Sequence, residues 1–199
     1  MRPLVARYLT DLVQLLLERG SKGAFFVMSS SGGTLSLELA REFPVRLVES
    51  GPAAGVSIAA HYATELDKPN LLSFDMGGTT AKISLVRGGV PTRTNELEVA
   101  RVRRFHKGSG ILLKVPAIDL IEIGAGGGSI ARVDALGLLA VGPHSAGADP
   151  GPVCYGRGGT APTVTDADLV LGYLDADHFL GGTMRLEREQ ALVAIEQHI

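Results

Sequence analysis

One segment constrains the fold of this chain more than any other: residues 71–89, LLSFDMGGTTAKISLVRGG. It begins with a short apolar run, LLSF, of the kind that forms a buried strand. Asp75 ends this run, Gly77 and Gly78 allow a tight turn, and a second apolar run, KISLV, follows. The pattern predicts a β-hairpin that carries a carboxylate beside a glycine turn.

Two interpretations of this turn remain open on spacing alone. Gly77 and Gly78 let backbone N–H groups approach a phosphate and point at it. The hydroxyls of Thr79 and Thr80 are further donors. Asp75 beside them could hold Mg²⁺, which takes few protein carboxylates, or could orient water. The alternative is an ordinary glycine hairpin turn preceded by a solvated aspartate.

A second candidate ligand site is the start of a predicted helix at Ser50 and Gly51, which runs to about residue 66. A helix N-terminus attracts anions through its unpaired N–H groups. Ordinary capping by Ser50 explains the same residues equally well. The many alanines of this helix predict a close crossing with another helix, or a helix that connects two lobes.

The glycines at 126, 127 and 128 invite a dinucleotide-binding interpretation, because GGGSIA matches G-x-G-x-x-A. That fingerprint requires a helix next, whereas residues 130–134 and 138–141 predict two short strands around a turn. A Rossmann site is therefore excluded, and the chain also lacks the G-x-x-x-x-G-K-[ST] motif of a P-loop. The glycines instead predict that the backbone passes close to a nucleotide or to a facing lobe.

The remaining segments predict an α/β chain. Helical periodicity covers residues 4–19, and strand patterns cover residues 24–28 and 45–48. Thr34 is the predicted cap of a helix over residues 35–42, which with its flanking strands suggests a βαβ unit. A final helix is expected over residues 187–198.

Several chemically active side chains have a structural explanation as well as a functional one. The basic run at residues 101–107 predicts a solvated face, or alternatively a cation that reaches phosphate. Cys154 has no partner at metal-ligand spacing, so a small packing residue is expected. Thr165 or Asp166 is expected to cap a helix through about residue 174, although Asp166 and Asp168 could also help to bind a divalent ion.

Composition limits the classes of protein. The chain has 199 residues, of which 45% are hydrophobic, and a net charge of −2. This charge gives no reason to expect nucleic-acid binding. No apolar run approaches the roughly 18 residues of a membrane span, so no membrane association is expected. A single cysteine excludes an internal disulfide and fits a reducing cytoplasm.

Residues 74–85, FDMGGTTAKISL, resemble the second phosphate-binding loop of the actin-like ATPase fold, which includes sugar kinases, Hsp70 and actin. Four further segments resemble the ATPase subunit of the hydantoinase A/5-oxoprolinase family, to which acetone carboxylase subunits also belong. They are SGPAAGV (50–56), IGAGGGSIARVD (123–134), VGPHSAGADPGPVCYGRGG (141–159) and PTVTDADLVLGYL (162–174). Five motifs in the family's order make this resemblance specific.

The resemblance implies an actin-like ATPase (ribonuclease H-like) fold that is incomplete in this chain. Residues 1–67 would form the C-terminal part of lobe one with a connecting helix, and residues 68–199 the N-terminal part of lobe two. The family's first phosphate loop and its adenosine-binding stretch have no match here. We therefore expect an internal fragment that is inactive alone. Lys82 stands where many relatives carry aspartate, which leaves its role open.

The function implied by the resemblance is ATP-dependent opening of a cyclic amide of the hydantoin or 5-oxoproline class. ATP would phosphorylate the amide oxygen, and a hydantoinase B-type partner subunit or domain would often complete the reaction. ATP and Mg²⁺ are the implied cofactors, with Asp75 as the catalytic and metal-binding residue. The implied nucleotide-binding residues are Gly77, Gly78, Thr79, Thr80, Ser50, Gly51, Gly126, Gly127 and Gly128. The alternatives are the ATPase subunit of a ketone carboxylase and a non-catalytic fragment.

Overall fold

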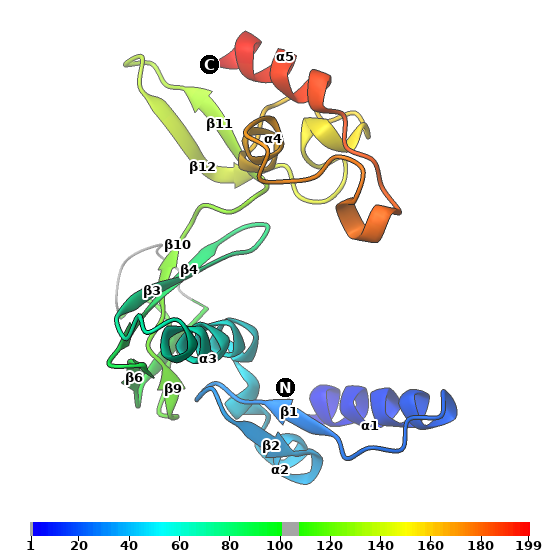
Figure 1. Ribbon diagram of the computed structural model, residues 1–199, viewed down its shortest axis with the longest axis vertical. Coiled ribbons are helices and arrows are strands. Elements are labelled where there is room, and N and C mark those ends of the chain that lie inside the picture. Colours follow the sequence, from blue (N-terminus) through cyan, green and yellow to red (C-terminus); the bar gives the residue numbers. More distant parts are fainter. Residues whose placement is uncertain (1, 101–107) are drawn as a thin grey trace. The chain divides into compact units, whose positions relative to one another are not determined.

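The computed structural model describes residues 2–100 and 108–199 and divides the chain into two compact units (Figure 1). The first unit comprises Met1–Asp75 and Lys82–Ile121, and the second comprises Met76–Ala81 and Glu122–Ile199. The basic run expected at residues 101–107 lies outside the described residues. The lobe boundary expected at residue 67 concerns the family's complete fold and stays a prediction.

The first unit begins with an α-helix and a small hairpin and continues into a helix and a set of short strands. Its helical elements are α1 (Arg2–Glu18), α2 (Leu37–Glu42), the 3₁₀ helix η1 (Pro44–Leu47) and α3 (Ser50–Glu65). Its strands are β1 (Phe26–Met28), β2 (Thr34–Ser36), β3 (Leu71–Met76), β4 (Ala81–Arg87), β5 (Val90–Pro91), β6 (Arg93–Thr94), β7 (Leu97–Val99), β8 (Ile111–Leu113) and β9 (Ala117–Ile118). Strand β10 (Ile121–Ile123) begins at the last residue of this unit and continues into the second.

The predicted hairpin of residues 71–89 is confirmed as β3 and β4. In the sheet, β4 lies between β3 and β10, and β5 pairs antiparallel with β4 through Val86 and Pro91. Helix α3 packs its small-residue face against this region, with Ala53, Ala60 and Val56 buried beside Val86 of β4. In the described part of the chain the alanines allow close packing of a helix on strands, and both the expected helix–helix crossing and the expected connection of two lobes stay predictions.

Two local predictions in the first unit are wrong. Thr34 begins strand β2, which pairs antiparallel with β1, and Ser36 is the true cap of α2. This hairpin replaces the expected βαβ unit. Residues 45–48 were expected to form a strand but lie in and after η1, because Pro44 favours a helical first turn. Ser30 supplies hydrogen-bond donors to two carbonyls of this segment: its N–H donates to Arg46 O (2.7 Å) and its hydroxyl donates to Val48 O (2.6 Å).

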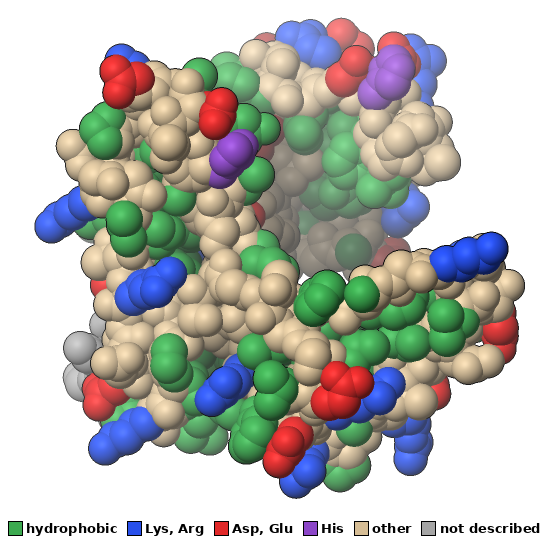
Figure 2. All heavy atoms as spheres, turned by 60° about the horizontal axis from the view of Figure 1, so that its bottom comes forward, with side chains coloured by type: hydrophobic (Ala, Val, Ile, Leu, Met, Phe, Trp, Pro, Cys, Tyr) green, Lys and Arg blue, Asp and Glu red, His purple; other side chains and the backbone are tan. Residues whose placement is uncertain are grey.

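Helix α1 confirms the predicted N-terminal helix, but within this unit it leaves much of its apolar side chain surface exposed. Only Leu9 of α1 is fully buried, whereas Leu4 and Tyr8 are mostly exposed. Hydrophobic side chains are accordingly visible on the surface of the molecule (Figure 2). No helix of the described residues has the length and hydropathy needed to cross a bilayer.

The second unit combines one β-hairpin with three short helical segments and a terminal helix (Figure 1). Its elements are β11 (Ser129–Val133), β12 (Leu139–Ser145), η2 (Val153–Tyr155), α4 (Val164–Val170), η3 (Phe179–Gly182) and α5 (Arg188–His198). Strand β11 follows the glycines directly and pairs antiparallel with β12. This confirms the two predicted strands and the exclusion of a Rossmann helix after residues 126–128.

Candidate functional site

The hairpin tip, residues 77–80, exposes a row of unpaired backbone donors. Gly77 N–H donates to Thr80 O at 2.9 Å and closes the turn. Within the described residues, the N–H groups of Gly78, Thr79 and Thr80 have no protein acceptor, and the two threonine hydroxyls make no hydrogen bond. Gly78 and Thr79 are also exposed to solvent. The tip therefore has several hydrogen-bond donors available to an anion, and its contact with phosphate stays a prediction.

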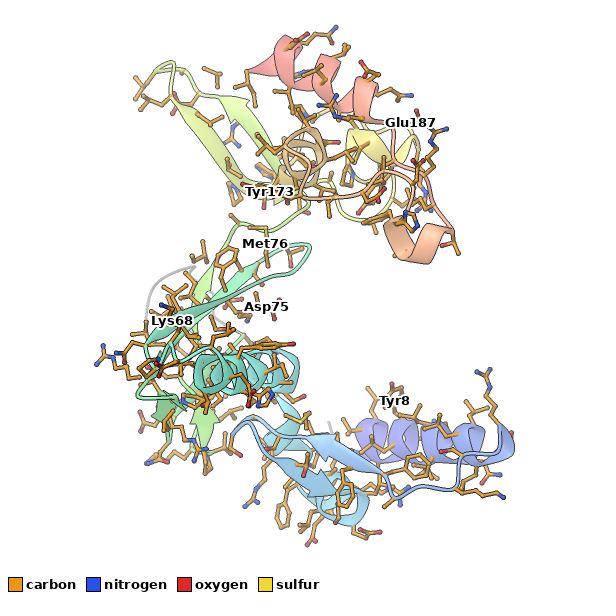
Figure 3. All side chains as sticks on the ribbon, viewed as in Figure 1. Tyr8, Lys68, Asp75, Met76, Tyr173 and Glu187 are labelled. Atoms are coloured by element: carbon orange, nitrogen blue, oxygen red, sulfur yellow. The ribbon has the colours of Figure 1, made fainter. Side chains whose placement is uncertain are left out.

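Asp75 lies at the end of β3, just before the tip, with an exposed side chain (Figure 3). A Cβ placed on Gly55 of α3 would lie 3.9 Å from Asp75 Oδ2, so this carboxylate faces a part of the helix that lacks a side chain. Within the described residues Asp75 has no hydrogen bond or ion pair. Its carboxylate is thus available to a cation or a water molecule.

The structure gives Lys82 a definite contact within the first unit. Its Nζ lies 3.0 Å from Oε1 and 3.0 Å from Oε2 of Glu49, and the two side chains are 13% and 30% exposed. This pair joins β4 to the residue that precedes α3. Lys82 therefore acts at least in part as a structural cross-link at the base of the hairpin.

The start of α3 differs from the prediction in its cap. Glu49, and not Ser50, is the N-cap residue, and it adopts a left-handed conformation with φ of 60° and no side-chain cap bond. Ser50 is the first helical residue, and Gly51 is exposed. Contact of Ser50 and Gly51 with a nucleotide stays a prediction.

The glycines of the triple-glycine loop, residues 126–128, lie against the hairpin tip within the second unit. Gly127 N–H donates to Gly77 O at 2.9 Å, and Gly128 N–H donates to Gly78 O at 2.8 Å. A Cβ on Gly126 would lie 2.6 Å from Gly77 O and from Thr79 N. The structure thus brings together two of the predicted nucleotide-binding segments, as neighbours in one backbone network.

The other two candidate metal ligands, Asp166 and Asp168, both belong to helix α4. Asp166 is fully buried as the N3 residue of a capping box with Thr163 at the start of α4, and Asp168 lies half-buried on the same helix. Burial raises the pKa of the Asp168 carboxyl. Among the described residues, no group of three or more histidine, cysteine, aspartate or glutamate side chains could hold a metal. The N-cap of α4 is thus Thr163, and not Thr165 or Asp166 as expected, although Asp166 completes the capping box.

Cys154 is a buried packing residue, as predicted. Its side chain is fully buried beside Leu169, Leu186 and Ala191. Burial, and then the neighbouring Asp166 carboxylate, raise the pKa of the Cys154 thiol far above its ordinary value. A thiol that stays protonated is a poor nucleophile, so this cysteine has no catalytic character.

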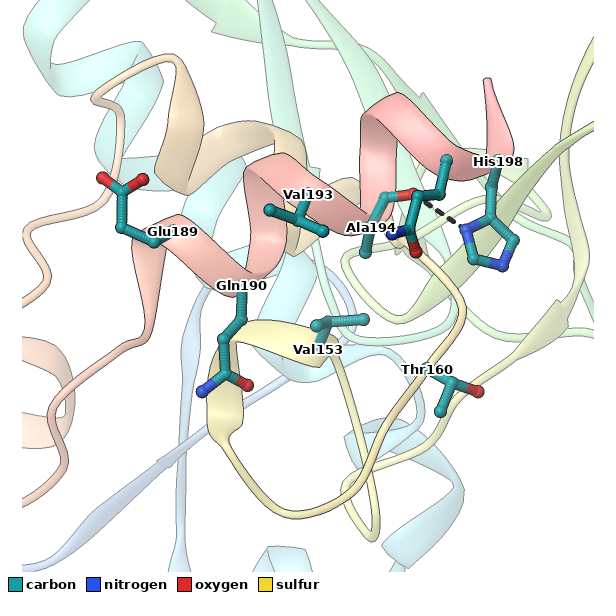
Figure 4. Close-up of a pocket in the computed structure, with 8 residues that line it drawn as sticks. Val153, Thr160, Glu189, Gln190, Val193, Ala194 and His198 are labelled. Atoms are coloured by element: carbon teal, nitrogen blue, oxygen red, sulfur yellow. Dashed lines mark hydrogen bonds between the residues drawn. The ribbon is translucent and has the colours of Figure 1, made fainter.

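A separate hollow of about 420 Å³ lies between η2 and α5 in the second unit (Figure 4). Val153, Val193 and Ala194 give it an apolar lining, with Glu189 at one side. His198 borders it, and one ring nitrogen of His198 is held 2.8 Å from Ala194 O. None of the predicted nucleotide-binding residues lines this hollow, and its chemistry does not suit a polyphosphate.

Sequence reasoning missed two contributors to the neighbourhood of the hairpin. Gly55 leaves space beside Asp75, and Thr165 N–H donates to Gly127 O at 2.8 Å. Gly55 belongs to the SGPAAGV segment, so the sequence showed its motif but did not show that it lies beside Asp75. Thr165 was visible only as a capping candidate.

Comparison with known proteins gives consistent relatives. Caprolactamase subunit alpha of Pseudomonas jessenii is 42% identical over 199 residues, which cover 100% of this chain and 27% of that protein. Among solved structures, nucleotide-free acetone carboxylase matches with a TM-score of 0.72 and 33% identity, covering 98% of this chain and 26% of the other. ATP-dependent caprolactamase from Pseudomonas jessenii matches with a TM-score of 0.68 and 39% identity, covering 98% and 27%.

The chain spans little more than a quarter of the length of these relatives. Over that span, it shares their α/β fold. The family model for hydantoinase/oxoprolinase matches residues 1–198, almost the whole sequence. The chain therefore belongs to the hydantoinase/oxoprolinase family.

Proposed function

We propose that the protein carrying this chain is an ATP-dependent cyclic-amide hydrolase of the hydantoinase/5-oxoprolinase type. In this proposal the fold is that of an actin-like ATPase, and the hairpin of β3 and β4 is its second phosphate-binding loop. The support from relatives is that a 42% identical protein is a caprolactamase subunit and that a matching structure is an ATP-dependent caprolactamase.

The observation that carries the proposal is the chemistry of the hairpin tip. Three successive N–H groups, at Gly78, Thr79 and Thr80, lack acceptors among the described residues, and they follow a carboxylate at Asp75 that lacks donors. Phosphate oxygens need several such donors. Mg²⁺ is commonly held by one or two carboxylates together with phosphate oxygens and water. The residues present therefore fit both ATP and Mg²⁺.

In this proposal the chain's own residues position and neutralise charge. The N–H groups and hydroxyls of residues 78–80 donate hydrogen bonds to phosphate oxygens. Asp75 holds Mg²⁺ or orients the acceptor. When bound, Mg-ATP supplies the phosphoryl group that activates the amide oxygen of the substrate. Such transfer depends more on positioning and charge stabilisation than on covalent chemistry by the protein. Nucleotide contacts from Ser50 and Gly51 belong to the same proposal. Residues 126–128 have all their N–H and carbonyl groups paired with the protein, so their proposed part is to approach the nucleotide without donating hydrogen bonds to it.

A partner of the hydantoinase B type is the proposed site of the hydrolytic step. The relatives support a multi-subunit arrangement, because several are described as subunits: caprolactamase subunit alpha, for example. The substrate class that we propose is a cyclic amide such as a hydantoin, 5-oxoproline or a lactam.

A ketone carboxylase is the second candidate. One observation favours it: the structure of acetone carboxylase matches this chain with a TM-score of 0.72, beside 0.68 for caprolactamase. In that case the same phosphate loop would serve activation of a ketone enol.

The test is Mg-ATP binding by calorimetry, followed by a panel of substrates with ATP consumption as the readout. The intact protein that carries this chain is expected to bind Mg-ATP, and residues 1–199 alone to bind it weakly or not at all. Cyclic amides are expected to stimulate ATP consumption. Stimulation by ketones with bicarbonate, and none by amides, would select the carboxylase. Absence of Mg-ATP binding by the intact protein would refute both.

A further inference from the structure

The triple-glycine loop makes hydrogen bonds with all its backbone groups. Gly126 N–H donates to Ser129 Oγ, and Ser129 N–H donates back to Gly126 O, both at 2.9 Å. The N–H groups of Gly127 and Gly128 donate to two carbonyls of the hairpin tip, those of Gly77 (2.9 Å) and Gly78 (2.8 Å). Gly128 O accepts from Ala146 N–H at 2.8 Å. A loop with no spare donor is suited to hold another segment in place.

The absence of side chains in this loop follows from its contact with the tip. A Cβ on Gly126 would lie 2.6 Å from Gly77 O, and one on Gly128 would lie 3.0 Å from Gly78 O. At Gly126 the obstacles are backbone atoms, which cannot rotate away as a side chain can. At Gly128 the Oγ of Ser145 would lie closer still, at 2.7 Å. The glycines therefore allow two backbones to lie in direct contact, and this contact fixes the carbonyls of Gly77 and Gly78.

The triple-glycine loop is held in turn by the first residues of α4. Thr165 N–H donates to Gly127 O at 2.8 Å. The Thr165 side chain packs so closely that its Oγ1 would lie 2.8 Å from a Cβ on Gly127. The start of α4 thus contacts the loop at Gly127, whose N–H donates to the hairpin tip.

Asp166 fixes the start of α4. Its fully buried carboxylate accepts hydrogen bonds from Thr163 N (2.8 Å) and Thr163 Oγ1 (2.8 Å). It also accepts from Cys154 N (2.7 Å) and Val153 N (3.3 Å) of η2. One carboxylate therefore ties η2 and the cap of α4 together, directly beside Thr165. Hydrogen bonds to a charged, buried acceptor are the strong ones.

We propose that Asp166 and Thr165 are positioning residues for phosphate binding, which act on the hairpin tip through Gly127. The inference rests on the proposed function, since the tip is taken as the phosphate site. The route is continuous in hydrogen bonds and packing: Asp166 fixes the start of α4, Thr165 holds Gly127, and Gly127 holds Gly77. Displacement of Gly77 misaligns the donors at residues 78–80 that follow it, and hydrogen-bond strength falls steeply with poor geometry.

The central test is a compensating pair at Gly127 and Thr165, made in the intact protein that carries this chain. Gly127→Ala introduces a Cβ against Thr165 Oγ1, and Thr165→Ala removes that oxygen while keeping its backbone N–H. Calorimetry measures the dissociation constants of Mg-ATP and of adenosine, which lacks phosphates. Gly127→Ala is expected to weaken Mg-ATP binding about tenfold, with adenosine affinity unchanged. The double variant is expected to regain most of the loss.

A second pair examines Asp166 with a control on the same helix. Asp166→Asn places an amide NH₂ among the N–H groups that the carboxylate accepts from, and is expected to weaken Mg-ATP binding in the same selective way. Asp168→Asn makes the same chemical change at a half-buried side chain that has no hydrogen bond among the described residues. It is expected to leave the affinity unchanged.

The outcomes separate this inference from the proposed function. If the wild-type protein binds no Mg-ATP, the proposed function fails and takes the inference with it. If the wild type binds and Gly127→Ala binds equally well, the inference alone is overturned. An equal loss of Mg-ATP and adenosine binding, without recovery in the double variant, indicates general damage and also overturns it.

Discussion

Two glycine-rich segments of this chain have similar composition and opposite hydrogen-bonding states. The hairpin tip (residues 77–80) keeps three successive N–H groups without protein acceptors within the described residues. The triple-glycine loop (residues 126–128) has every N–H and carbonyl group paired with the protein. Glycine serves both roles because it exposes the backbone. The exposed backbone can face a ligand, or it can face another backbone.

The difference shows how a glycine motif should be interpreted once a structure is known. A glycine that meets backbone atoms if given a Cβ is required by packing, as at Gly126. A glycine whose added Cβ would meet nothing is not required by packing, and Gly78 is of this kind. Its conformation is also open to other residues, because Gly78 is not among the glycines with positive φ. For Gly78, we propose that a ligand approaching the backbone is the reason for glycine.

The largest expected effect comes from adding a methyl group to the triple-glycine loop. Gly126→Ala places a Cβ 2.6 Å from Gly77 O and from Thr79 N, and backbone atoms at both contacts must move. We expect the free energy of unfolding to fall by about 3 kcal/mol, in the range of severe overpacking. Urea unfolding measures this loss. Gly33→Ala is the control, because its Cβ would meet nothing, and an equal loss in both variants would refute the packing argument.

The next largest effect tests the hairpin tip through Asp75, the carboxylate that precedes it. Asp75→Asn is expected to reduce ATP turnover about 100-fold, equivalent to about 2.7 kcal/mol of activation free energy, because a neutral amide is a poor ligand for Mg²⁺. Stability should be unchanged, since the Asp75 side chain is exposed and makes no hydrogen bond in the described part of the chain. Steady-state ATPase assays and thermal unfolding measure both quantities. Asp119→Asn, at another exposed aspartate, should retain full turnover.

A smaller effect is the pH dependence of stability that arises from Cys154, which lies beside the residues that support the triple-glycine loop. The pKa of the Cys154 thiol is raised in the folded protein, so folding favours its protonated form. This contribution is fully present below the ordinary thiol pKa of about 8.5 and is lost as pH rises above it, by at most about 1.4 kcal/mol per pH unit. Urea unfolding of the wild type and of Cys154→Ala between pH 7 and 10 measures it. Relative to Cys154→Ala, the free energy of unfolding of the wild type should fall only above about pH 8.5. A difference that stays constant with pH would contradict the prediction.

Local sequence patterns predicted those parts of the fold that depend on neighbouring residues. The apolar runs on either side of Gly77 and Gly78 define β3 and β4, and the periodic leucines define α1. Where a distant residue decides, the prediction failed. Residues 45–48 look like a strand, but besides the effect of Pro44 their carbonyls bond to a distant residue: the Ser30 hydroxyl donates to Arg46 O and Val48 O.

The same limit applies to the candidate site. The sequence identified Asp75 and the glycine tip, because a carboxylate and a glycine turn are adjacent in the chain. It also marked residues 126–128 as a close backbone approach. It could not identify what they approach, since Gly127 and its partner Gly77 are separated by a long stretch of chain. Asp166 likewise looked like a local helix cap, whereas its bonds to η2 depend on tertiary folding.

The smallest expected change in stability distinguishes the two glycine segments most directly. Gly78→Ala adds a Cβ in open space at a residue without positive φ, so the free energy of unfolding should change by less than about 0.5 kcal/mol. Mg-ATP binding should nevertheless weaken, because a methyl group then stands where a phosphate would approach the backbone. Urea unfolding and calorimetry on this one variant measure both. Unchanged affinity would mean that the tip's free donors face only solvent, and the hairpin would then be an ordinary turn held by the triple-glycine loop.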